Sequence, residues 1–242
     1  MIVEQGLTKE VLNNPQHNYT KALLACRPNK NSKGKRLTVV SDFLHPDSQQ
    51  IQAQPHNNQP GNKTILSVEK LQVHFPVEKN IFGKTVKWFK AVDEVSFEVK
   101  EKETLGLVGE SGCGKTTLGR AILQLVKPTA GKILLNGKDI SSLSPAALRA
   151  TRKDLQIVFQ DPYGSLNPRI SIGEAILEPL RVHQLQNDAK QRKEKVIDLL
   201  EKVNLQPDHF NRYPHQFSGD HRQRICIARA LALDTSFIIF DA

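Results

Sequence analysis

The sequence predicts an α/β domain with a mainly parallel sheet, and three observations support that prediction. From Thr64 onward, segments with the alternating apolar pattern of strands take turns with segments that have the apolar spacing of helices. A glycine-rich loop separates the short apolar run TLGLVG from a helical pattern. A second apolar run, FIIF, is of the kind that lies buried in a parallel sheet. Strands that alternate with helices are typical of α/β folds.

The expected elements follow one another along the chain. ILSVEKLQVHF and AVDEVSFEVK alternate in hydrophobicity and are expected to be extended. TLGLVG is expected to be a buried strand because it is short, apolar and closed by a glycine. Helices are expected over residues 116–125, 190–203 and 218–233, and short strands over residues 155–159 and 236–240.

The bulk properties exclude several classes of protein. The 242 residues have a mean hydropathy of −0.41, no apolar run long enough to span a bilayer, and no basic start followed by an apolar stretch. Cys26, Cys113 and Cys226 have no metal or disulfide spacing, which favours a reducing, cytosolic setting. The net charge of +9 comes from scattered basic residues without an aromatic-rich stripe. A solvated surface is therefore favoured over a nucleic-acid partner or an anionic membrane.

The composition divides the chain into three regions. Residues 1–28 mix polar and apolar side chains. Residues 29–64 are rich in Asn, Gln, Lys, Ser and Pro, and such a composition buries too little apolar surface to fold, so a flexible linker is expected. Residues 65–242 carry the strand and helix patterns and form the predicted α/β domain.

The segment GESGCGKT, residues 109–116, matches the pattern GxxxxGK[ST] of a phosphate-binding loop and stands between a predicted strand and a predicted helix. Its glycines let backbone N–H groups curl around an anion, and the helix that starts here points its positive end at the phosphates. Lys115 is expected to reach the β- and γ-phosphates, and the Thr116 hydroxyl to ligate Mg²⁺. The predicted nucleotide-binding residues of the loop are Gly109, Ser111, Gly112, Gly114, Lys115, Thr116 and Thr117.

Asp241 follows the apolar strand FIIF, at the end where ligands bind in open α/β sheets. A lone aspartate after a strand is more often a turn residue. Because a phosphate loop lies upstream, Asp241 is instead predicted to be a second contact of Mg²⁺.

Four ordered motifs, GESGCGKTT, FQDPYGSLNPR, QFSGDHRQRICIARAL and FIIFD, resemble the ATPase subunits of ABC transporters. FQDPYGSLNPR looks like the branch that imports oligopeptides and dipeptides. The resemblance covers about residues 65–242. It implies a P-loop ATPase core with a helical subdomain, which binds ATP and Mg²⁺ and powers peptide import.

The resemblance also assigns roles to single residues. Phe75 matches the aromatic residue that stacks on adenine. Gln160 matches the glutamine that senses Mg²⁺ and the attacking water, and residues from about 161 to 217 match the helical subdomain. Ser218 and Gly219 match the start of the signature motif, which caps the ATP held by a second unit. The insertion KNIFGKTVKWF offers further aromatic residues for adenine: Phe82, Trp88 and Phe89.

The implied partners are a second ABC ATPase unit in a head-to-tail dimer, transmembrane permease subunits and, indirectly, a solute-binding protein. The implied location is the cytoplasmic face of the membrane. IVEQG and NPQHNYTKALL, within residues 1–28, look like the tail of a preceding ATPase unit. The sequence therefore predicts the middle of a protein with two fused units, with an unrelated N-terminal extension as the alternative.

Three departures from the family pattern bear on activity. The signature usually has the sequence SGGQ, whereas Asp220 and His221 follow Ser218-Gly219 here, and the Asp220 carboxylate would repel the partner's γ-phosphate. Ala242 stands where the family has its catalytic glutamate. The chain then ends, so a switch histidine and a central strand are expected to be missing and the domain to be incomplete and poorly stable. A non-hydrolysing regulatory or assembly module, a soluble ABC protein acting on ribosomes or DNA, and the product of a truncated gene remain alternatives.

Overall fold

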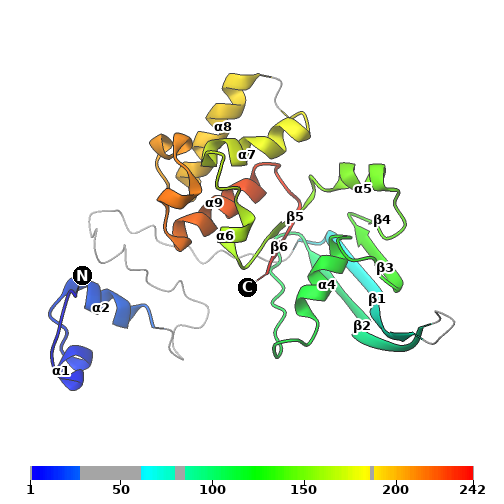
Figure 1. Ribbon diagram of the computed structural model, residues 1–242, viewed down its shortest axis with the longest axis horizontal. Coiled ribbons are helices and arrows are strands. Elements are labelled where there is room, and N and C mark those ends of the chain that lie inside the picture. Colours follow the sequence, from blue (N-terminus) through cyan, green and yellow to red (C-terminus); the bar gives the residue numbers. More distant parts are fainter. Residues whose placement is uncertain (1, 28–60, 80–84, 186–187, 242) are drawn as a thin grey trace. The chain divides into compact units, whose positions relative to one another are not determined.

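The computed structural model describes residues 2–27, 61–79, 85–185 and 188–241 (Figure 1). The chain divides into two compact units, Met1–Gln59 and Pro60–Ala242. Most of the expected linker lies outside the described residues, and Thr64, its last residue, already begins a strand of the second unit. Among the residues that the structure describes, no helix has the length and apolar character needed to cross a membrane.

The described part of the first unit contains two short helices, α1 (Thr8–Asn13) and α2 (Asn18–Ala25). The His17 ring caps α2 by accepting a hydrogen bond from the backbone N–H of Tyr19 at 3.1 Å. Glu4 holds this cap in place, because its carboxylate accepts from the backbone N–H of His17 at 3.2 Å. The predicted tail thus has helical structure of its own, and its origin in a preceding ATPase unit stays a prediction.

The second unit begins with a four-stranded sheet. β1 (Thr64–Lys79) and β2 (Thr85–Lys100) form a long antiparallel hairpin. β1 also pairs with β3 (Ala130–Leu135), which pairs in turn with β4 (Lys138–Asp139), and both pairings are antiparallel. The resulting order is β2-β1-β3-β4, and α4 (Lys115–Ile122) packs against β1 and β2 through its apolar side (Figure 1).

The rest of the second unit is mainly helical. The expected helix over 190–203 is confirmed as α8, whose buried residues Val196, Leu199 and Leu200 lie on one stripe. The elements are α5 (Pro145–Thr151), β5 (Leu155–Val158), α6 (Pro162–Ser165), α7 (Ile172–Val182), α8 (Ala189–Lys202), the 3₁₀ turns η2 (Pro207–Asn211) and η3 (Pro214–Gln216), α9 (Gly219–Leu231) and β6 (Phe237–Phe240).

Two hydrophobic cores lie side by side in this unit, and β5 takes part in both. Leu155, at the start of β5, belongs to the core formed by the four-stranded sheet and α4. Val158, at its end, belongs to the core formed by α7, α8 and α9. Residues that follow β5, Gln160 among them, are therefore anchored where the sheet core meets the helical core.

The strand pairing differs in part from the prediction of a mainly parallel sheet. β5 and β6 pair in parallel, from Leu155 with Phe237 to Val158 with Phe240. The four-stranded sheet is antiparallel throughout, so the described pairing is mixed. Alternation of apolar and polar residues is typical of antiparallel strands with one covered face, whereas buried parallel strands are continuous apolar runs. The alternating patterns of β1 and β2 were therefore the signal that could have predicted their antiparallel pairing.

TLGLVG does not form the buried strand that was predicted. Within the described residues it has no ladder partner, and the exposed fractions are 48% for Leu105, 55% for Leu107 and 92% for Val108. A strand needs a neighbour to satisfy its backbone groups. None of the described strands pairs with TLGLVG, so the run is an exposed loop.

Candidate nucleotide-binding site

The phosphate loop has the backbone geometry that its glycines predict. Gly112 and Gly114 have φ angles of +82° and +99°, in the region that favours glycine, and Gly114 caps α4. A Cβ atom on Gly114 would lie 2.2 Å from the carbonyl oxygen of Ala91 on β2. The tight approach of loop to strand thus requires a glycine at this position.

Lys115 folds back over the loop that precedes it. Its Nζ donates hydrogen bonds to the carbonyl oxygens of Gly109 and Glu110, each at 2.7 Å, and lies 3.6 Å from Cys113 Sγ. The ammonium is thus held over the bend from which α4 starts. The first N–H groups of α4 have no intrahelical acceptor, so together with the Lys115 ammonium they favour an anion at this end of the helix.

Thr116 and Asp241 meet although 125 positions separate them in the sequence. Thr116 Oγ1 donates a hydrogen bond to Asp241 Oδ1 at 3.1 Å. The backbone N–H of Asp241 donates to Val158 O at 3.0 Å, which fixes the aspartate at the end of β6 beside β5. A hydroxyl and a carboxylate oxygen are ligands that suit Mg²⁺ when phosphate oxygens complete the shell. The described residues contain no cluster of three or more His, Cys, Asp and Glu side chains that could hold a metal by themselves.

A cavity of about 1480 Å³ joins these groups. Its lining also includes Leu105 and Leu107 of the exposed TLGLVG run and apolar residues of β6. The predicted site residues in its lining are Gly109, Ser111, Gly112, Gly114, Lys115, Thr116, Thr117, Gln160 and Asp241. The structure therefore brings together the seven predicted residues of the loop, Gln160, which lies two residues after β5, and Asp241, which directly follows β6.

The aromatic residue predicted to stack on adenine has a close neighbour on the opposite strand. Phe75 pairs with Phe89 across β1 and β2, and their exposed fractions are 39% and 55%. Phe89 is among the residues that line the cavity, and Phe75 is not. Adenine stacking by Phe75 stays a prediction, and Phe89 is the better placed of the alternatives in the described part of the insertion.

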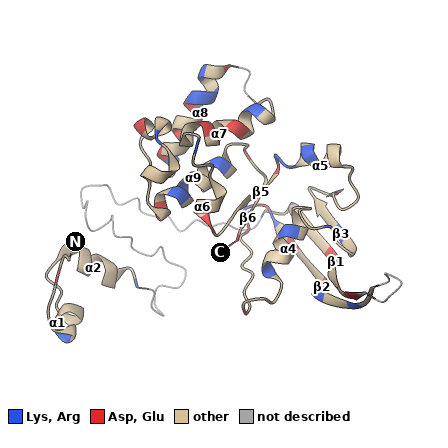
Figure 2. Ribbon diagram, in the orientation of Figure 1, with Lys and Arg blue, Asp and Glu red and all other residues tan. Residues whose placement is uncertain are grey.

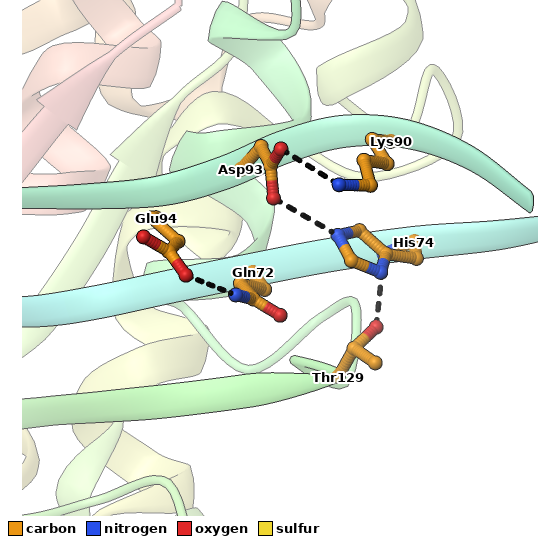
Figure 3. Close-up of polar contacts among 6 residues, drawn as sticks. All are labelled: Gln72, His74, Lys90, Asp93, Glu94 and Thr129. Atoms are coloured by element: carbon orange, nitrogen blue, oxygen red, sulfur yellow. Dashed lines mark hydrogen bonds and ion pairs between the residues drawn. The ribbon is translucent and has the colours of Figure 1, made fainter.

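A polar network that no sequence motif predicted joins residues next to this pair on the two strands (Figure 3). Asp93 accepts hydrogen bonds from Lys90 Nζ at 3.1 Å and from the His74 ring at 3.4 Å. The Lys90 hydrogen bond, with help from His74, lowers the pKa of Asp93. The backbone N–H of His74 donates to Thr129 Oγ1 at 2.9 Å, so β1, β2 and the segment before β3 are tied together beside Phe75 and Phe89.

The signature residues lie outside the cavity lining. Ser218 caps α9: its Oγ accepts from the backbone N–H of His221 at 3.4 Å. Asp220 is not an isolated charge, because its carboxylate accepts from Arg224 Nε at 3.0 Å, one helical turn away. This pairing reduces the repulsion that Asp220 would exert on a phosphate, and the i, i+4 spacing in the sequence is the signal that could have revealed it. Ala242 lies outside the described residues.

The basic residues of the described part of the second unit are distributed over several helices (Figure 2). Lys and Arg lie on α4, α5, α8 and α9. A glycine loop that wraps an anion site, a lysine above it and a hydroxyl–carboxylate pair beside it define the class of P-loop nucleotide-binding proteins.

A family model described as "ABC transporter" matches residues 92–242. The chain belongs to the ABC transporter family, as its motifs predict. Glutathione import ATP-binding proteins GsiA from Escherichia coli strain K12 and from Shigella flexneri are each 46% identical to it over 244 residues. These alignments cover 99% of the chain but 39% of the relatives, so the chain spans about two fifths of their length.

Solved structures agree with the predicted fold. The dimeric structure of MJ0796, described as a bacterial ABC transporter cassette, superposes with a TM-score of 0.64 at 26% identity, over 72% of each chain. A post-hydrolysis state of MJ0796 bound to ADP and Pi gives a TM-score of 0.63 at the same identity and coverage. The cbiO1 protein from Clostridium perfringens superposes with a TM-score of 0.61 over 74% of this chain and 65% of that one. Its sequence identity is 24%, so this likeness supports the fold and no more. The predicted ABC ATPase fold is confirmed.

Proposed function

We propose that this chain supplies an ATP-binding unit that powers the import of peptides or similar solutes through an ABC transporter. The observation that carries the proposal is the hydrogen bond between Thr116 and Asp241 beside the Lys115 ammonium, on the wall of one cavity. The relatives' names support the direction of transport, and glutathione, which the GsiA names specify, is itself a tripeptide.

The proposed ligand is ATP with Mg²⁺. The loop amides and Lys115 would hold the phosphates, and Phe75 or Phe89 would stack on adenine. Thr116 and Asp241 would hold Mg²⁺ together with phosphate oxygens, and Gln160, which lines the same cavity, would contact the ion or its water. When bound, the ion neutralises charge on the phosphates.

The first proposed partner is a second ATPase unit, and the signature residues, which do not line the cavity, support it. Ser218 and Gly219 lie outside its lining, as they would if they capped the nucleotide of a second unit, and the MJ0796 cassette is described as a dimer. The alignment with GsiA covers 99% of this chain, so it extends over most of residues 1–28, and it covers only 39% of the relative, which supports two fused units. Permease subunits, a solute-binding protein and a place at the cytoplasmic face of the membrane complete the proposal.

A second cavity is the favoured surface for a permease subunit. It measures about 960 Å³ and lies next to Phe159, the neighbour of Gln160. Lys127, Arg149 and Arg152 line it together with one carboxylate, that of Glu178. An acidic, partly apolar segment of a membrane protein would complement this lining.

A non-hydrolysing nucleotide-binding module is the second candidate function. Ala242 is the specific observation that favours it, because a methyl group cannot accept a proton from an attacking water. In that case ATP would bind with the same residues and act by stabilising an assembly. ATP binding without measurable hydrolysis would distinguish it from the first candidate.

A nucleotide titration of the whole chain tests the proposal. Wild-type protein should bind ATP with Mg²⁺ in a saturable manner, and Lys115→Ala should abolish that binding while the circular dichroism spectrum stays unchanged. Lys132→Ala, which removes an exposed lysine from β3, is the matched control and should bind as the wild type does. Equal affinity for Lys115→Ala and the wild type would refute the assignment.

A further inference from the structure

The register of the long hairpin shifts by one residue at Ala91. On β1, Val73 and His74 are neighbours in the sequence. Their partners on β2, Val92 and Lys90, are separated by Ala91, which is therefore an additional residue on that strand. A β-bulge of this kind bends a strand and turns the side chains beside it. The path of β2 through the bulge thus decides where the aromatic residues farther along the hairpin lie.

The bulge lies against the phosphate loop. A Cβ atom on Gly114 would collide with the backbone carbonyl oxygen of Ala91, so this carbonyl is in close contact with the turn from which α4 starts. Ala91 and Phe89 both line the cavity, and Phe89 is 55% exposed. The short stretch of β2 between these two residues therefore sets the distance from a base stacked on Phe89 to phosphates held by the loop.

Three polar side chains hold the bulge in place (Figure 3). One carboxylate oxygen of Asp93 accepts from Lys90 Nζ at 3.1 Å, so this ion pair spans Ala91. The other oxygen lies 3.4 Å from Nε2 of His74, which connects the bulged strand to β1. Only 16% of the His74 side chain is exposed, so the carboxylate meets a partner that is itself held by its surroundings.

The neighbouring strand β1 is fixed from its other edge at the same level. The backbone N–H of His74 donates to Thr129 Oγ1 at 2.9 Å. The backbone N–H of Thr129 donates in turn to Gln72 O at 2.7 Å. Because the segment before β3 anchors β1 in this way, the contact between His74 and Asp93 ties the bulge of β2 to a fixed neighbour.

We propose that Asp93 is a positioning residue for the nucleoside part of the ligand. Its contacts with Lys90 and His74 fix the bulge at Ala91. The bulge then places the Phe89 ring at one distance from the phosphate loop. Only a ligand that has both phosphates and a base uses this placement, because inorganic triphosphate reaches the loop alone. The inference rests on the proposed function, since it requires phosphates at the loop and a base at the aromatic ring.

Two ligands separate the contribution of the base from that of the phosphates. Isothermal titration calorimetry of the whole chain gives dissociation constants for ATP and for inorganic tripolyphosphate, each with Mg²⁺. The wild type should bind ATP more tightly than tripolyphosphate. Phe89→Ala should reduce that advantage at least about fivefold, the lower end of the range for one base stacked on an aromatic ring.

Substitutions of the polar side chains test the positioning role. Asp93→Ala should reduce the advantage of ATP by about twofold to fivefold, the range of a well-formed exposed ion pair, and leave the affinity for tripolyphosphate unchanged. Asp93→Asn, which keeps one acceptor oxygen, should reduce it less. Lys90→Ala frees the bulge from the other side and should act as Asp93→Ala does. Glu78→Ala is the matched control, because it breaks the 3.0 Å ion pair with Lys87 on the same hairpin without spanning the bulge, and it should behave as the wild type does.

Each contrary outcome has a distinct meaning. If folded Asp93→Ala and Lys90→Ala keep the wild-type advantage of ATP, or if Asp93→Ala weakens both ligands by the same factor, Asp93 does not position the base and the inference is wrong. It is equally wrong if Phe89→Ala leaves the advantage unchanged, or if Glu78→Ala reduces it as much as Asp93→Ala. A folded wild type that binds neither ligand would overturn the proposed function, and the inference with it.

Discussion

Replacing Gly114 by alanine tests how far the loop geometry depends on one missing Cβ atom. The residue has φ +99°, which costs an alanine about 1–2 kcal/mol. Its new Cβ atom would also lie 2.2 Å from Ala91 O, far inside contact distance. Overpacking of this kind typically costs about 1–3 kcal/mol more, so the expected total loss of unfolding free energy is about 2–5 kcal/mol.

Gly137→Ala supplies the matched control for that experiment. Gly137, in the turn between β3 and β4, has φ +78° but no atom within 4 Å of a new Cβ atom. It should therefore show the backbone cost alone, about 1–2 kcal/mol. Chemical denaturation gives the two free energies, and an ATP titration should show weakened binding for Gly114→Ala only. Equal losses of stability and unchanged ATP affinity in both variants would show that the loop and β2 need not approach this closely.

Three further outcomes follow from the structure. Val108→Lys should reduce self-association in light scattering, because it places a charge in the exposed TLGLVG run; unchanged association would show that this run is not the associating surface. The lowered pKa of Asp93, caused first by Lys90, stabilises the fold above pH 3.8 and loses that effect as pH falls through the lowered value. The melting temperature of Asp93→Asn should therefore fall less than that of the wild type on acidification below pH 3.8, and identical pH profiles would contradict this. Ala242→Glu should raise ATP hydrolysis by about 10²- to 10⁴-fold if a missing general base limits turnover, and an unchanged rate would place the limit elsewhere.

The features that could be predicted from the sequence are those encoded within a few residues. The phosphate loop needs glycines and a lysine at fixed spacing, so GESGCGKT predicted a loop whose glycines let the backbone curl, and Gly112 and Gly114 have positive φ angles. Ser218 was expected at the start of a helix and caps α9. The stripe of α8 follows helical spacing and is buried as predicted.

The features that the sequence could not predict depend on neighbours that are distant in the chain. TLGLVG has the composition of a buried strand, yet Val108 is exposed because no described strand pairs with it. The link between His74 and Thr129 spans 55 positions and arises only when β1 meets the segment before β3. Phe75 and Phe89 are cross-strand partners on the same face of the hairpin, so the choice between them depends on which of the two strands lies nearer the cavity.

Binding of ATP to the wild-type chain, measured by isothermal titration calorimetry with Mg²⁺ and again with EDTA, tests the central claim most directly. The arrangement of Lys115, Thr116 and Asp241 predicts one saturable site per chain whose affinity is higher with Mg²⁺. Thr116→Val and Asp241→Asn should each reduce that metal dependence. A folded chain that binds no ATP, or binds it equally well with Mg²⁺ and with EDTA, would contradict the account.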